Sequence, residues 1–115
     1  MFEQRRDKRI PIHLPTKIYL GHLTHTGETQ NVSKHGVCLI CSSRFPQGAI
    51  LDLELLIQQA DALHISGRVI WIREVFSRVF TGFTYGVELR TKPQEYEAYL
   101  EQLMGAIHPN GMSHQ

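Results

Sequence analysis

The sequence predicts a mainly β protein, a small six-stranded antiparallel β-barrel with a C-terminal α-helix. Three successive segments in the second half of the chain alternate apolar and polar residues, which is typical of strands with one buried face. The last part of the chain changes to apolar residues spaced three or four apart, the period of an amphipathic helix. About six strands in one short chain favour closure into a barrel, because closure leaves no exposed strand edge.

Length and composition predict one folded domain. The chain has 115 residues, of which 42% are hydrophobic and 20% charged, the balance of an ordinary globular protein. We expect residues 1–15 to form a flexible arginine-rich arm, 16–108 to form the barrel domain with a helix at about 93–107, and 109–115 to be a frayed tail. No apolar stretch approaches the ~20 residues of a membrane span, and no signal segment opens the chain, so we expect a cytoplasmic protein.

The first half of the chain contains the shorter strands. A strand is expected at about Thr16–Leu20, followed by a polar turn or hairpin at His22–Glu28 and a short strand that runs into Asn31. The segment NVSKHG then interrupts the strands. Residues 37–42 are apolar or small without helical spacing, which predicts a strand buried on both faces. The letters FPQG after it predict a turn.

The second half has the clearest patterns. The run LDLELLI at 51–57 places its leucines on one strand face and its two acidic residues on the other. A second alternating strand covers 63–75, and we expect Trp71 within it to belong to the core. A third alternation follows at 83–89, and Pro93 suits the first turn of the C-terminal helix.

Two short motifs indicate an anion-binding site. Four of the twelve Lys and Arg residues fall in RRDKR at 5–9, although the net charge of the chain is only +1. Within this run, Arg5 and Arg9 form an R-x-x-x-R pair with Arg6 between them. The second motif is N-x-S-x-x-G at 31–36. Guanidinium groups pair bidentately with phosphate or guanine and stack on purines, while amide and hydroxyl groups can both donate and accept hydrogen bonds.

Together, RRDKR, NVSKHG and the GVEL segment at 86–89 resemble the signature of the PilZ domain family, over nearly the whole chain. The resemblance implies a split barrel that acts as a receptor for the bacterial second messenger cyclic di-GMP. It implies that both motifs bind this ligand, through Arg5, Arg6, Arg9, Asn31, Ser33 and Gly36. Gly36 is expected to allow a positive φ or a close backbone approach.

Two residues bear on stoichiometry and affinity. Gln4 stands before the first motif arginine, where another arginine in the family goes with a stacked ligand dimer. This leaves one or two ligand molecules open, with a lean toward one. Asn31 offers one acceptor oxygen where an aspartate offers two, which predicts weaker binding than in an aspartate-bearing relative.

No catalytic motif is found, since the GxSxG elbow, HExxH and the P-loop are all absent from the sequence. We therefore expect a non-enzymatic protein without a cofactor. Cys38 and Cys41 have C-x-x-C spacing, but residues three apart on a strand point to opposite faces, so neither a metal site nor a disulfide is expected.

The expected partners are cyclic di-GMP and a downstream protein of the flagellar, secretion, polysaccharide-synthesis or transcription machinery. Neither specific nucleic-acid binding nor membrane insertion is expected. One alternative is a PilZ-like adaptor that works through protein contacts without nucleotide. Another is a nonspecific nucleic-acid binder that uses the basic arm.

Overall fold

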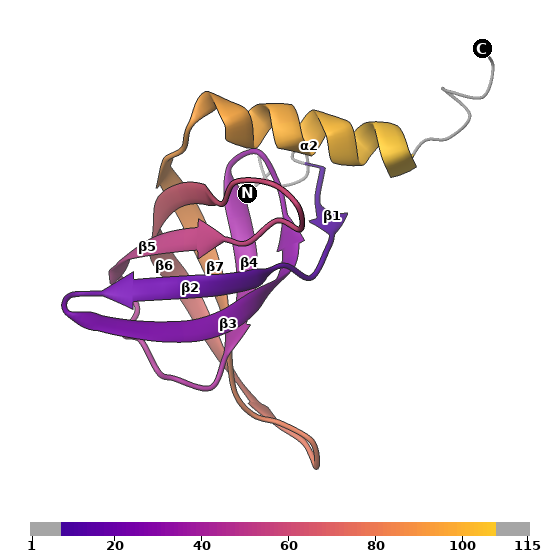
Figure 1. The fold of residues 1–115 in the computed structure, drawn as a ribbon. Coiled ribbons are helices and arrows are strands. Elements are labelled where there is room, and N and C mark those ends of the chain that lie inside the picture. The colour runs from indigo at the N-terminus through magenta and orange to yellow at the C-terminus, as the bar shows by residue number, and fades with distance from the viewer. Residues whose placement is uncertain (1–7, 108–115) are drawn as a thin grey trace.

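The computed structural model describes residues 8–107, which form seven strands and one helix (Figure 1). In chain order these are β1 (Ile10–Pro11), β2 (Pro15–Leu20), β3 (Leu23–Val32), β4 (Gly36–Cys41), β5 (Ile50–Leu55), β6 (Leu63–Phe76), β7 (Thr81–Thr91) and α2 (Gln94–Ile107). Six strands close into an antiparallel barrel in the order β3, β2, β5, β6, β7, β4, with β4 pairing back to β3. The predicted six-stranded barrel with a C-terminal helix is confirmed, and β1 adds a short extra strand on β3.

Strand alternation builds the core, as the LDLELLI run predicts. Leu51, Leu53 and Leu55 of β5 point inward and are buried, and the acidic residues between them face outward. Each buried leucine contributes about 1.5–3 kcal/mol relative to an exposed one. The helix α2 crosses one end of the barrel (Figure 1), where Tyr96 and Leu100 join the core. Within the described residues, no helix has the length and hydrophobicity needed to cross a membrane.

The predicted turn or hairpin at His22–Glu28 is a hairpin, but it turns earlier and more tightly than the length of the polar stretch suggests. β3 already begins at Leu23, and the chain reverses between β2 and β3 through Gly21 and His22 alone. Gly21 has a φ of 62°, a left-handed conformation that glycine adopts without a Cβ clash. The polar side chains after it lie on the outside of the barrel, mostly exposed or half-buried, and their polarity therefore resembles that of a loop.

Two burial predictions were wrong. The pattern of β4 predicts burial on both faces, but Val37 and Leu39 point into the core while Cys38 lies half-buried on the outer face. Trp71 is not a core residue, because it is 38% exposed on the outside of β6. A β-bulge between Val69 and Trp71 causes this difference, since one extra residue moves the following side chains to the opposite face.

The predicted flexible arm, residues 1–15, is in part packed against the barrel. Ile10 and Leu14 are core residues with 4% and 7% exposure, and the Leu14 N–H donates to Thr29 Oγ1 at 2.9 Å. These two apolar side chains hold the chain on the barrel before β2 begins, so the folded domain starts earlier than the charge pattern predicts. Residues 1–7 and 108–115 lie outside the described residues.

Candidate functional site

The N-x-S-x-x-G motif forms the turn between β3 and β4. Ser33 is buried, and its hydroxyl donates to the Gly36 carbonyl oxygen at 3.1 Å and accepts from the Gly36 N–H at 3.2 Å. Gly36 does not have a positive φ. A Cβ at Gly36 would lie 3.1 Å from the Val87 carbonyl oxygen, so a close backbone approach is the reason for glycine here. Ser33 and Gly36 therefore shape the turn.

Arg9 brings the arm onto this turn. β1 pairs with the end of β3 so that Pro11 lies opposite Asn31, and Arg9 Nη1 donates to Asn31 Oδ1 at 3.1 Å. Arg9 is exposed and Asn31 is half-buried, so both side chains reach solvent. The two predicted motifs meet here although 22 positions separate these residues. Arg5 and Arg6 lie outside the described residues.

Sheet pairing extends this contact across the outer face of four strands. Asn31 of β3 lies opposite Cys38 of β4. Cys38 in turn lies opposite Gly86 of β7, which lies opposite Trp71 of β6. The Trp71 indole rests on the Gly86 backbone, since a Cβ there would be only 2.0 Å from Trp71 Nε1. We call the following residues the outer row: Arg9, Asn31, Cys38, Gly86, Trp71 and Arg73.

Two guanidinium groups flank the middle of the outer row. The guanidinium carbon of Arg73 lies 5.6 Å from the centre of the Trp71 ring, within cation–π range. Burial raises the pKa of the Cys38 thiol, and the charges of Arg9 and Arg73 act in the opposite direction. Both cations are therefore within electrostatic reach of Cys38. The outer row has two positive charges, no acidic side chain and one flat ring, a set that suits an anion carrying planar bases.

The turn is also tied to the start of α2. The Tyr96 hydroxyl donates to the Ser33 carbonyl oxygen at 2.7 Å, and Tyr96 is fully buried. Just before the helix, Lys92 Nζ donates to the Lys34 carbonyl oxygen. Hydrogen bonds therefore connect the turn directly to the beginning of the helix.

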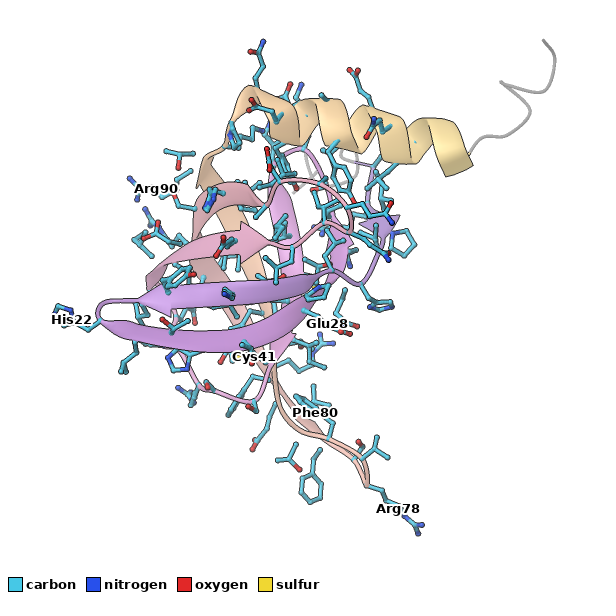
Figure 2. All side chains as sticks on the ribbon, viewed as in Figure 1. His22, Glu28, Cys41, Arg78, Phe80 and Arg90 are labelled. Carbon is cyan, nitrogen blue, oxygen red and sulfur yellow. The ribbon has the colours of Figure 1, made fainter. Side chains whose placement is uncertain are left out.

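A shallow hollow of about 440 Å³ lies beside the outer row, on the outside of β3 and β4. Its lining includes Glu28, Gln30, Ile40 and Phe80, and it lies where the barrel meets the projecting β6–β7 hairpin (Figure 2). Gln30 directly precedes Asn31, and a bulge in the pairing between β3 and β4 falls at this position. The hollow therefore borders the β3 end of the outer row, although no outer-row residue lines it.

The two cysteines face opposite sides of β4, as their spacing predicts. Cys38 belongs to the outer row, whereas Cys41 is buried and its thiol donates to the Thr26 carbonyl oxygen at 3.3 Å. Across residues 8–107, no three His, Cys, Asp or Glu side chains are placed to hold a metal ion.

The sequence reasoning did not predict four members of the outer row as site residues, namely Cys38, Gly86, Trp71 and Arg73. One signal was available, because glycine inside a strand often marks a close approach of another group, and Gly86 sits in the middle of β7. That signal does not identify the approaching group. The partner depends on the register of β6 against β7, which the bulge near Trp71 changes.

The chain matches a protein-family model over most of its length. The model of the PilZ domain matches residues 3–106, almost the entire chain. The chain belongs to the PilZ domain family. The family assignment agrees with the resemblance carried by RRDKR and NVSKHG. A search of curated proteins found no match.

Solved structures confirm the fold of this PilZ domain. It resembles the PilZ domain of YcgR from Escherichia coli with c-di-GMP, with a TM-score of 0.72 and 16% identity, covering 96% of this chain and 95% of that chain. The MrkH–c-di-GMP complex of K. pneumonia has a TM-score of 0.72 and 12% identity, with coverage of 96% and 55%. The Bacillus subtilis inhibitor of motility, MotI/DgrA, has a TM-score of 0.70 and 15% identity, with coverage of 87% and 49%. The chain thus spans only about half the length of the last two proteins.

Proposed function

We propose that this PilZ domain is a non-enzymatic receptor for cyclic di-GMP. The hydrogen bond between Arg9 and Asn31, at 3.1 Å, carries the proposal, because it joins the two motifs at one end of the outer row. A guanidinium and an amide side by side suit a ligand that combines phosphodiester charge with guanine edges. The choice of ligand is supported by the similar YcgR and MrkH structures, which contain c-di-GMP.

The proposed site assigns different tasks to the two motifs. Arg9, with Arg5 and Arg6 of the same motif, neutralises the two phosphodiester charges. The Asn31 side chain accepts from a guanine N–H, in exchange for its present bond from Arg9. Ser33 and Gly36 act as positioning residues, since the Ser33 hydroxyl is engaged with Gly36 inside the turn.

Occupancy of this site is relayed to a partner protein in the cytoplasm. The support for a relay is the bond from the Tyr96 hydroxyl to the Ser33 carbonyl oxygen, which connects the ligand-binding turn to α2. Two similar structures belong to an inhibitor of motility and a transcription regulatory factor. Motility and transcription machinery are therefore the first partners to test, before secretion and polysaccharide synthesis.

Titration calorimetry with cyclic di-GMP tests the proposal. Arg9→Ala is expected to weaken binding about tenfold or more, because a hydrogen bond to a charged group contributes about 1.5–3 kcal/mol. Asn31→Ala is expected to weaken it as well. Arg78→Ala is the matched control, because it removes the same charge at the tip of the hairpin (Figure 2) and should leave affinity unchanged.

Equal affinity of wild type, Arg9→Ala and Asn31→Ala would show that the site is elsewhere. A chain that gives no heat and no rise in melting temperature with the nucleotide would instead support the adaptor that works without it. Competition by single-stranded or duplex nucleic acid at equal affinity would support the nonspecific binder. Affinity for cyclic di-GMP should also fall as salt rises, because charged phosphates are neutralised.

A further inference from the structure

The hollow beside the outer row is a pocket next to the proposed ligand site. Glu28, Cys41 and Phe80, which all line it, mark its position in Figure 2. The lining combines the apolar side chains of Ile40 and Phe80 with the polar side chains of Glu28 and Gln30. Apolar walls with a few convergent polar groups are typical of sites for small planar ligand groups.

A β-bulge places Gln30 and Asn31 on the same side of β3. The register of β3 against β4 shifts between Thr29 and Asn31, so Gln30 is an extra residue in the strand. Thr29 and Val32 are buried, whereas Gln30 and Asn31 between them are both half-buried. In a regular strand, one of these two neighbours would point into the core. The bulge therefore turns Gln30 toward the hollow, beside the side chain that the proposed function assigns to a guanine.

The polar groups of the hollow match one edge of guanine. An ionised carboxylate only accepts hydrogen bonds, while the amide of Gln30 can donate. The Watson–Crick edge of guanine donates from N1 and N2 and accepts at O6, and proteins read unpaired bases through this edge. Adenine has the opposite pattern, with an acceptor at N1 and a donor at N6. Glu28 and Gln30 together therefore suit guanine and disfavour adenine.

Glu28 is available for such a contact. It lies opposite Ile40 on the outer face, and its side chain is 47% exposed. Its Oε2 lies 3.6 Å from His13 Nδ1, and the His13 side chain is 62% exposed. A long ion pair at an exposed position is weak. The carboxylate can therefore exchange this contact for hydrogen bonds from a base.

Charge indicates which part of cyclic di-GMP enters the hollow. The guanidinium groups of Arg9 and Arg73 belong to the outer row, whereas a carboxylate lines the hollow. A phosphodiester beside Glu28 would be repelled, since like charges close together cost free energy. A guanine is neutral and brings N–H donors to the same carboxylate. The phosphodiesters therefore belong over the outer row and a base belongs in the hollow.

We propose that the hollow is the subsite for the second guanine of cyclic di-GMP, where Glu28 accepts from N1 and N2 and Gln30 donates to O6. The first guanine is at Asn31, so this inference rests on the proposed receptor function. Asn31 and Glu28 are at most about 10 Å apart along β3. The two guanines project from opposite sides of the ring that joins them, and one ligand molecule therefore spans both positions.

Titration calorimetry of the full chain with cyclic di-GMP and cyclic di-IMP tests the subsite. Cyclic di-IMP lacks only the two N2 amino groups and keeps the charge and shape of the ligand. Glu28→Gln should weaken cyclic di-GMP binding by about tenfold, because one neutral acceptor oxygen replaces two charged ones. Its preference for cyclic di-GMP over cyclic di-IMP should also be smaller than that of wild type. Glu101→Gln is the matched control, since it removes the same charge from an exposed position on α2 and should change neither quantity.

The direction of the effect distinguishes this contact from charge alone. A carboxylate that is only near the ligand repels its phosphodiesters, so Glu28→Gln would then strengthen binding of both nucleotides. Gln30→Ala is the second variant and should weaken cyclic di-GMP binding by about fivefold. It decides the matter if Glu28→Gln lowers the melting temperature of the free protein.

The outcomes separate the subsite from the receptor function. If Arg9→Ala weakens cyclic di-GMP binding while Glu28→Gln and Gln30→Ala bind at least as tightly as wild type, the guanine subsite is overturned and the receptor function stands. If wild type does not bind cyclic di-GMP, both are overturned. Weaker binding in both hollow variants, with a reduced preference for cyclic di-GMP in Glu28→Gln, supports the subsite.

Discussion

Replacing Gly86 with alanine would force a methyl group into the space of the Trp71 indole. The three atoms nearest to the added Cβ all belong to that ring, at 2.0 Å (Nε1), 2.3 Å (Cε2) and 2.6 Å (Cδ1). Such distances are too short for any Cβ contact, so the ring must move. Overpacking of this kind costs about 1–3 kcal/mol, and alanine in a strand otherwise gains about 0.5–1 kcal/mol over glycine. We expect the free energy of unfolding to fall by about 1–2 kcal/mol.

A double-mutant cycle isolates the clash. In a Trp71→Ala background the obstructing ring is gone, so Gly86→Ala should be neutral or should stabilise the fold by about 0.5–1 kcal/mol. Gly82 provides a contrast on the same strand. A Cβ there would lie 2.5 Å from the Phe80 ring and also 2.6 Å from the Cys41 carbonyl oxygen. Phe80→Ala should therefore fail to rescue Gly82→Ala, because the backbone contact remains.

The assay combines urea unfolding, followed by circular dichroism, with tryptophan fluorescence. The chain contains one tryptophan, so the emission of the folded protein reports on Trp71 alone. In Gly86→Ala the emission should shift to longer wavelength as the ring moves into water. The reasoning is refuted if Gly86→Ala keeps the stability and emission of wild type, or if its cost persists in the Trp71→Ala background.

Three further predictions concern other parts of the fold. Tyr96→Phe removes the hydroxyl that donates to the buried Ser33 carbonyl oxygen, and it should lower the free energy of unfolding by about 1–3 kcal/mol. A change within error would show that this hydrogen bond contributes nothing. Gly105→Ala should raise the free energy of unfolding by about 0.5–1 kcal/mol, because a Cβ there meets no atom within 4 Å; a fall in stability would contradict this. Burial raises the pKa of the Cys38 thiol, so less thiolate is present at neutral pH. Iodoacetamide should therefore modify Cys38 more slowly than it modifies the amino acid cysteine in solution. Cyclic di-GMP should slow the modification further, as mass spectrometry can measure, and equal rates with and without nucleotide would contradict binding on the outer row.

Local pattern was sufficient to predict several elements of this fold. The alternation at 51–57 predicts β5 and its buried leucines, since neighbouring side chains of a strand point to opposite faces whatever the strand pairs with. The change of period after Arg90 predicts α2 for the same kind of reason. The motifs at 5–9 and 31–36 also predict a shared site, and the Arg9–Asn31 bond brings the described part of these motifs together.

Other features depend on contacts that no local pattern contains. The polar residues of β3 are strand residues because β2 and β4 pair with them, which overrides their preference for a turn. Trp71 is on the outside because one bulge shifts the alternation of β6. Its position against Gly86 and near Arg73 follows from the pairing of β6 with β7. The sequence by itself determined which segments have a buried face and which residue types can bind an anion. Tertiary structure decided which strands lie side by side and in what register, because backbone pairing between distant segments sets both.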